Sequence, residues 1–314
     1  MNLLVIIEHK NGVMHRMSKE AISGAQKIGG DITALVIGEN SDQVVDKLSS
    51  FQIEKTLIVI HEKVPTYNVD GYKEIILKVV KVLNPELIIA GHTYQARDFM
   101  PRLSANLDIP FIPDLVGIEN SSYVKQIMNS KLNASISLST AAALVSFQSA
   151  SFSVESIIKG SSSSEKFEVE IEESNIKSIS DDPFQQSASE VDLESAELIV
   201  SVGRGIEKEE NTSIAFELAK SLGAEVSASR PVVDAGWLPS SRQVGSSGST
   251  VSPKLYFSLG VSGAIQHVVG MKGSNNILAI NKDQDAPIFE IADYAAVGDL
   301  LEIIPKLIEK LKAS

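Results

Sequence analysis

Four short segments in the second half of the chain carry hydroxyl, cationic or histidine side chains, three of them together with glycine. They are GRG at 203–205, SRP at 229–231, GSSGST at 245–250 and VSGAIQH at 261–267. Glycine lets the backbone turn sharply and approach a phosphate, while arginine and small hydroxyl residues donate hydrogen bonds to anions or ring carbonyls. Each segment alone also fits a tight turn or a solvated surface loop, and a lone histidine in such a turn is ordinarily structural.

The position of these segments strengthens the interpretation, because each stands at or just after a predicted strand. In the second half we expect strands at 198–202, 226–229, 256–261 and 277–280, with helices at 214–222 and after Asp299, which can cap the last one. Strands that alternate with helices predict a parallel sheet. Ligands of open parallel sheets bind beyond the carboxyl ends of the strands, so the segments are placed to form one site.

The first half shows the same alternation. Apolar runs at 3–7, 32–37, 57–60 and 87–90 predict buried parallel strands. Ser18 is expected to cap a helix that ends at Gly29 and Gly30, and Asp70 to begin a second helix. Between 130 and 154 a serine-rich, β-branched alternation predicts added antiparallel strands.

The 314-residue length suits two α/β domains. We expect an N-terminal parallel-sheet domain with added antiparallel strands over 1–185 and a C-terminal Rossmann-like parallel-sheet domain over 186–314. The segment 176–197, rich in Ser, Asp, Glu and Gln, is the predicted linker, with a surface loop inside one domain as the alternative.

Composition excludes several classes of function. The chain has no cysteine, which excludes disulfides, thiolate metal sites and cysteine nucleophiles, and no metal site is expected. Its net charge of -12 argues against nucleic acid or an anionic membrane as the main partner. No apolar run reaches the roughly 18–20 residues of a membrane span. The first residues enter an apolar run without a basic leader, so we expect a cytoplasmic protein, with a processed mitochondrial matrix form as the alternative.

The stretch LYFSLGVSGAIQHVVGMKGSNNILAIN at 255–281 resembles the signature of electron transfer flavoprotein alpha subunits. GRG at 203–205, SRPVVDAGW from Ser229, QVG from Gln243 and APIFEIADY from Ala286 resemble the same family in the same order. So does AGHTYQARDFMPRLSANL in the first half. The resemblance therefore covers essentially the whole chain and is strongest from Leu198 onward.

The resemblance implies roles for particular residues. It places Arg204 and Ser229 against a bound FAD dinucleotide, Arg230 beside the isoalloxazine ring, and His267 near the O2 atom of that ring. It places Asn281 and Asp299 toward the adenosine end. The segments that line the ring edge and wrap the phosphates, ribityl chain and pyrimidine edge are Val244, Gly245, Ser246 and Ser247, and Ser262, Gly263, Ala264, Ile265, Gln266 and His267.

One departure from the family pattern affects the ring edge. The family usually has Gln and then Thr where this chain has Ser246 and Ser247. Ser247 keeps a hydroxyl that can donate to the ring, whereas Ser246 cannot reproduce a Gln amide.

The family resemblance further implies an electron carrier and no catalytic residue of its own. We expect one FAD per heterodimer with an electron transfer flavoprotein beta subunit, which would hold AMP. Electrons would come from flavin dehydrogenases such as the acyl-CoA dehydrogenases of fatty acid beta-oxidation. They would pass to a membrane electron transfer flavoprotein-quinone oxidoreductase, without insertion of this chain into the membrane.

Three alternatives stay open. The first is a flavin-bifurcating member of the same family, which uses NADH and a second FAD. The second is an NAD-dependent Rossmann-type enzyme, against which stands the absence of GxGxxG after 198–202 and of an acidic residue closing the next strand. The third is a nucleotide-sensing module built on the first half.

Overall fold

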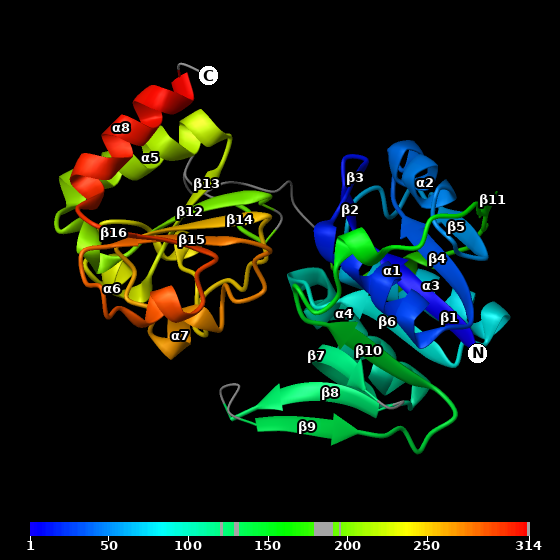
Figure 1. Cartoon of the computed structure of the whole chain (residues 1–314). Helices are drawn as coiled ribbons and strands as arrows, with labels where there is room; N and C mark the ends of the chain where they lie inside the picture. The colour runs from blue at the N-terminus through cyan, green and yellow to red at the C-terminus, as the bar shows by residue number, and fades with distance from the viewer. Residues whose placement is uncertain (120–121, 129–131, 179–190, 195, 313–314) are drawn as a thin grey trace. The chain divides into compact units, whose positions relative to one another are not determined.

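The computed structural model describes residues 1–119, 122–128, 132–178, 191–194 and 196–312. The chain divides into two compact units, Met1–Pro183 and Phe184–Ser314, and each is built on its own sheet (Figure 1). The predicted α/β fold class is therefore confirmed. Most of the predicted linker at 176–197 lies outside the described residues, and the boundary at 185 and 186 stays a prediction.

The first unit holds a nine-stranded sheet in the order β11-β5-β4-β1-β6-β10-β7-β8-β9. Its strands are β1 (Asn2–Ile7), β4 (Asp31–Ile37), β5 (Lys55–Val59), β6 (Leu87–Gly91), β7 (Phe111–Glu119), β8 (Ser122–Ile127), β9 (Leu132–Ile136), β10 (Ala143–Phe147) and β11 (Ser163–Lys166). Pairs from β11 to β7 are parallel, and β7, β8 and β9 pair antiparallel.

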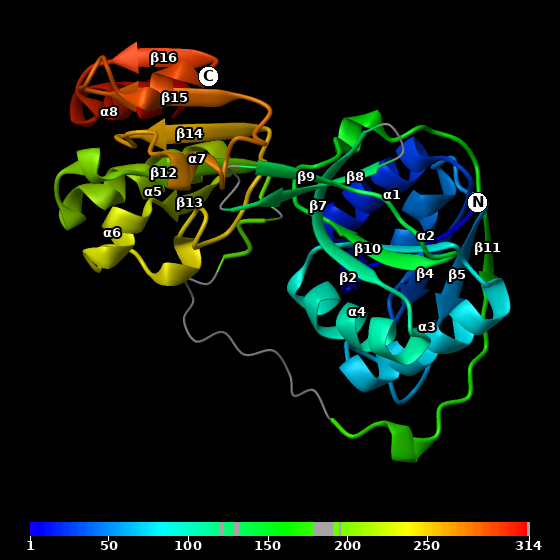
Figure 2. The ribbon, with the colours of Figure 1, turned by 90° about the horizontal axis from the view of Figure 1, so that it is seen from below.

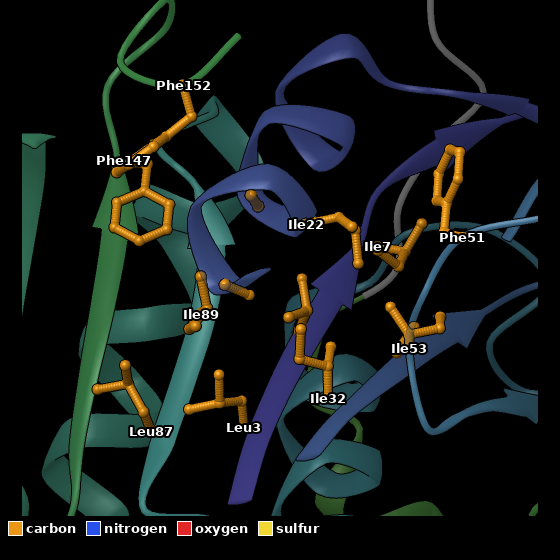
Figure 3. Packing of buried hydrophobic residues seen from close by; sticks show 14 of the residues in the cluster. Leu3, Ile7, Ile22, Ile32, Phe51, Ile53, Leu87, Ile89, Phe147 and Phe152 are labelled. Carbon is orange, nitrogen blue, oxygen red and sulfur yellow. The ribbon is translucent and has the colours of Figure 1, made fainter. Parts of the chain in front are cut away.

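Helices cover both faces of this sheet, which explains the continuous apolar strands. Leu3 and Ile7 of β1 point to the face packed by Ile22 of α1 (Arg16–Ile28) (Figure 3). α2 (Asp42–Ser49) packs on the same face. Leu4 points to the opposite face, which α3 (Val69–Leu83) and α4 (Tyr94–Leu107) cover.

Two expectations about helix starts are corrected. The cap of α1 is His15, whose Nδ1 accepts from Met17 N at 3.2 Å. Ser18 lies in the first turn of the helix, where its Oγ accepts from Glu8 N at 2.8 Å and so connects the helix to the end of β1. The chain folds back one turn earlier than predicted because a short hairpin of β2 (His9–Lys10) and β3 (Val13–Met14) precedes α1.

Asp70 was expected to begin a helix, and α3 begins one residue earlier, at Val69. The cap is Asn68, whose side-chain oxygen accepts from Gly71 N at 3.0 Å. Asp70 accepts instead from the backbone of Lys177 and Ser178, at 3.0 and 3.1 Å, so its side chain binds a segment distant in the sequence.

The antiparallel prediction for 130–154 is half right. β9 is antiparallel, but β10 lies between β6 and β7 and runs parallel to both. The antiparallel part begins earlier, because β7 and β8 form a hairpin. β10 is buried along its whole length, as expected of a strand in the middle of a sheet.

The second unit holds five parallel strands in the order β13-β12-β14-β15-β16 (Figure 2). They are β12 (Leu198–Val202), β13 (Glu225–Ala228), β14 (Leu255–Leu259), β15 (Ile277–Asn281) and β16 (Tyr294–Val297). α5 (Thr212–Leu222) and α8 (Leu300–Lys312) lie side by side over one face (Figure 1). The chain leaves β12 toward one edge and returns to β14 on the other side, so the order reverses between β12 and β14.

Candidate functional site

All predicted site residues stand at the carboxyl edge of the five-stranded sheet. Arg204 follows β12, Ser229 follows β13, and the turn 260–267 follows β14. Asn281 ends β15, and Asp299 follows β16. The place where the strand order reverses, between β12 and β14, is where open α/β sheets bind their ligands. The structure brings the segments to one edge, and their contact with a cofactor stays a prediction.

The loops after β12 and β14 pack backbone against backbone. Gly205 N donates to Gly260 O at 3.0 Å, and a Cβ added to Gly205 would lie 2.7 Å from Gly260 Cα. Gly203 faces the same segment and has no room for a Cβ either. Only glycine allows this approach, which explains the GRG sequence. Arg204 between the two glycines is exposed and forms no ion pair with any residue the structure describes.

The turn after β14 presents small side chains to solvent. Ser262, Ala264 and Gln266 are exposed, and so is Ile265, at 74%. Gly263 has a φ of +88°, and its neighbour Ser262 accepts from Ile288 N at 3.0 Å. The backbone of Ile288 therefore fixes the inner side of the turn, while its outer side is exposed to solvent. The short helix α7 (Ile265–Val268) follows the turn.

The loop 244–250 is joined to this turn. Ser246 N donates to Gln266 O at 2.7 Å. Gly245 lies so close to the same carbonyl that a Cβ would be 2.8 Å from it. Ser247 is exposed, and its Oγ accepts from Gln243 Nε2 at 2.9 Å. Since that oxygen is already an acceptor, its own proton is available to a ligand.

Ser229 and Arg230 follow β13 and differ in their exposure to solvent. Ser229 is buried, whereas the Arg230 side chain is 69% exposed. Arg230 Nε lies 3.3 Å from Asp234 Oδ2 within α6 (Arg230–Asp234). An exposed pair of this kind is worth about 0–1 kcal/mol, so a ligand charge can compete for the guanidinium.

Asn281 and Asp299 are occupied with the protein itself. Asn281 Nδ2 donates to Val261 O at 3.0 Å and so steadies the start of the 261–267 turn. Asp299 Oδ1 accepts from Leu301 N at 2.8 Å, which confirms it as the cap of α8. Its other oxygen lies 3.2 Å from Lys282 Nζ. The Leu301 hydrogen bond, followed by Lys282, lowers the pKa of Asp299.

His267 lies beneath the site and is only 6% exposed. Its Nε2 is 2.9 Å from the hydroxyl of Tyr256, which is fully buried in β14. Burial lowers the pKa of His267 to about 4, partly offset by the Val244 backbone. The ring is therefore neutral at physiological pH.

Sequence reasoning missed Tyr256 as a neighbour of the site. A signal was present, because alternation along β14 puts Tyr256 and Ser258 on one face, and a buried tyrosine hydroxyl requires a partner. His267 is the polar residue that follows shortly after on the same face.

The edge fits a phosphate-bearing cofactor on its own geometry. The glycine contacts bring backbone close, and Arg204, Ser247 and Ser262 offer exposed donors. A cavity of about 360 Å³ lies elsewhere, at the amino ends of first-unit strands near Asn2 and Asp31, where no such pattern occurs. Among the described residues no group of three or more His, Asp or Glu could hold a metal ion, and no helix is long and apolar enough to cross a membrane.

Comparison with known proteins points to one family. Residues 3–175 match the electron transfer flavoprotein domain, and residues 192–272 match the electron transfer flavoprotein FAD-binding domain. The electron transfer flavoprotein subunit alpha of Thermoanaerobacterium thermosaccharolyticum is 36% identical, and the alignment covers 99% of this chain and 98% of the relative. The Bacillus subtilis subunit is 33% identical, with 99% and 97% covered. The Pseudomonas aeruginosa subunit is also 33% identical, with 98% and 99% covered.

Proposed function

The chain belongs to the electron transfer flavoproteins as an alpha subunit, and from this premise we propose that it binds FAD at the carboxyl edge of its five-stranded sheet. The family consists of electron carriers, so the chain has no substrate turnover of its own. The proposal rests on one observation: the residues that match the FAD-binding domain include most of the segments of the site. The FAD-binding match at 192–272 contains the glycine contacts between 203–205 and 260, the loop 244–250 and the turn 261–267.

Each segment has a task that its geometry supports. Arg204 and Ser229 bind the dinucleotide, and the turn 262–267 wraps the phosphates, ribityl chain and pyrimidine edge. Arg230 and the loop 244–247 line the ring. Asn281 and Asp299 lie on the adenosine side, where they hold the loops in shape. FAD supplies the electron chemistry when bound, and these residues hold it and adjust its electron affinity.

Arg230 is the residue with the largest electrostatic leverage on the ring. A guanidinium near a developing negative charge stabilises it by about 1–4 kcal/mol, with the lower end applying to an exposed site. Because its pairing with Asp234 is exposed and weak, Arg230 can turn toward the ring at little cost. It therefore favours acceptance of electrons.

We further propose that the chain works as a heterodimer with a beta subunit and binds FAD poorly alone. The domain over 1–185 pairs with that subunit, and the domain over 186–314 holds the flavin. Flavin dehydrogenases, such as those acting on acyl-CoA, would reduce it, and a membrane quinone oxidoreductase would reoxidise it. We place this exchange in the cytoplasm. Of the similar proteins, the Cryptococcus neoformans relative is named as mitochondrial, which matches the alternative location.

The test is co-expression with a beta subunit, followed by an absorption spectrum and identification of the released cofactors. We expect a yellow complex with one FAD and one AMP. Two FAD per complex would instead indicate the bifurcating form, which uses NADH. A colourless complex would refute flavin binding. Stoichiometric FAD on the isolated chain would refute the need for the partner.

A further inference from the structure

Three serines form a row across three adjacent strands of the second sheet, next to the proposed flavin site. Ser227 on β13, Ser201 on β12 and Ser258 on β14 pair in register on adjacent strands, and all three are 0% exposed. None of their hydroxyl oxygens has a hydrogen-bond partner of good geometry among the described residues. Strand alternation puts them on the same face as Tyr256, so a buried polar strip lies behind the 261–267 turn.

Tyr256 connects this strip to His267. Its hydroxyl is 2.9 Å from His267 Nε2. Burial raises the pKa of Tyr256 strongly, and the nearby hydroxyls of Ser201 and Ser227 lower it in part. The phenol therefore keeps its proton, and the serine hydroxyls share its face of the sheet.

Two proton arrangements satisfy the 2.9 Å contact, and their costs differ. In the first, Tyr256 donates its hydroxyl proton to Nε2, and the His267 proton is on Nδ1. In the second, Nε2–H donates to Tyr256, and Nδ1 carries a bare lone pair. Nδ1 has no partner of good geometry among the described residues, and the Val244 backbone is the other polar group that acts on the ring. Val244 N already donates to Ala228 O at 3.0 Å, so the Val244 group that acts on the ring is its carbonyl. A carbonyl beside a bare lone pair in a buried place is repulsive, so the first arrangement is favoured.

We propose that Tyr256 is a positioning residue that donates to Nε2 of His267 and so holds the imidazole as the neutral tautomer with its proton on Nδ1. His267 then has one proton to offer, at one atom, on the side of the ring away from Tyr256. It acts as a hydrogen-bond donor and not as a base, since its basic nitrogen is occupied.

The consequence for the site depends on the proposed function. His267 ends the turn 262–267, and Val244 begins the loop that lines the ring. A donor fixed at Nδ1 either ties these two segments together or donates to the pyrimidine edge of bound flavin. In both cases the tyrosine in the sheet sets the direction of the donor, because a histidine without a fixed tautomer presents a mixture of donor and acceptor.

The experiment is nitrogen NMR on the purified complex with ¹⁵N-labelled histidine, which distinguishes protonated from unprotonated ring nitrogens. The chain has five histidines, and loss of a signal in His267→Gln identifies the relevant one. We compare the native chain with Tyr256→Phe, which removes only the hydroxyl. Tyr294→Phe is the matched control, because Tyr294 is 62% exposed on the edge strand of the same sheet.

At neutral pH the native ring should show a protonated Nδ1 and an unprotonated Nε2. In Tyr256→Phe the ratio of the two tautomers should shift toward Nε2–H by roughly two- to tenfold, as expected for the loss of one hydrogen bond. Tyr294→Phe should leave it unchanged. A protonated Nε2 in the native chain would overturn the proposal, and that spectrum decides even if Tyr256→Phe does not fold. An unchanged ratio in a folded Tyr256→Phe would overturn it as well.

A second readout separates this proposal from the proposed function. The flavin potential of Tyr256→Phe should move in the same direction as that of His267→Gln, while Tyr294→Phe should not move it. If the complex holds no flavin, the proposed function fails, whereas the nitrogen spectrum still decides the tautomer. Opposite shifts in the two variants would contradict the role of Tyr256 in directing His267.

Discussion

Replacing Gly263 by alanine tests whether the turn after β14 is shaped by the close contact seen in the structure. A Cβ at this position would overlap the backbone of Ile288 and lie 2.6 Å from its Cα. Backbone cannot move aside as a flexible side chain can, so either the turn or the 287–288 segment must shift. That shift would also break the hydrogen bond from Ile288 N to Ser262 O.

The expected cost has two parts. The left-handed conformation of Gly263, with φ of +88°, costs an alanine about 1–2 kcal/mol. The overlap adds roughly 1–3 kcal/mol, as overpacking does elsewhere. Gly263→Ala should therefore lower the free energy of unfolding of the second unit by about 2–5 kcal/mol.

Gly223→Ala is the matched control. Gly223 ends α5 with φ of +66°, and no described heavy atom lies within 4 Å of the Cβ position. This variant carries the conformational cost without the overlap, so it should lose only about 1–2 kcal/mol. The difference between the two variants isolates the contact with Ile288.

The measurement is urea unfolding followed by the fluorescence of Trp237, the only tryptophan of this chain. Trp237 packs against the core of the second unit, so its fluorescence follows the unfolding of this unit. The unfolding of the two units is then not analysed as one transition. If Gly263→Ala is no less stable than Gly223→Ala, the contact between the turn and the 287–288 segment is not as described, and the explanation of the turn fails.

Three further predictions concern the ring and the histidine. Arg230→Ala should lower the flavin potential by about 40 mV per kcal/mol of lost charge stabilisation; an unchanged potential in a redox titration would remove Arg230 from the ring. Ser247→Ala should lower the potential by a few tens of millivolts at most, and Ser247→Thr should raise it by less, because the β-branched side chain holds the same hydroxyl more firmly; no change in Ser247→Ala would mean that the hydroxyl does not contact the ring. Since the pKa of His267 falls from 6.5 to about 4 on folding, the unfolded chain binds this proton more tightly. The free energy of unfolding of the second unit should therefore decrease by up to about 3 kcal/mol as the pH is lowered from 6.5 to 4. Unfolding followed by Trp237 fluorescence should show this decrease in the native chain and not in His267→Gln.

Strands buried on both faces were the easiest part of the fold to predict from the sequence. The runs that became β1 and β6 are uninterrupted and apolar, because helices cover both faces of the first sheet. β11 was not predicted, since its four residues, SSEK, are all exposed and carry no apolar pattern. It joins the sheet only through pairing with β5, which local sequence does not encode.

Helix starts were predicted less well than helix positions. Ser18 and Asp70 both have the chemistry of a cap, but each uses its side chain for a contact with a distant segment, and His15 and Asn68 cap instead. Propensity describes what a residue can do locally, whereas tertiary hydrogen bonds decide which of those options it takes.

The carboxyl edge of the second sheet could be anticipated because the segments at 203–205, 229–231 and 261–267 stand at the end of a predicted strand or directly after it. The surroundings of His267 could not, because the turn sequence does not show that the imidazole points inward. Burial makes this ring neutral, with a pKa of about 4. The ion pair between Asp299 and Lys282 could not be predicted either. The two residues follow β16 and β15, which become neighbours only when the sheet forms.

The central claim, that this chain carries electrons on a flavin and converts no substrate, is tested most directly by mixing two proteins anaerobically. The purified complex with its beta subunit is mixed with a flavin dehydrogenase and that enzyme's substrate, and the flavin absorbance of the complex is followed. We predict that the flavin is reduced only when dehydrogenase and substrate are both present, and is reoxidised when a quinone oxidoreductase is added. Reduction of the flavin by the substrate without the dehydrogenase, or failure of every dehydrogenase to reduce it, would contradict the account.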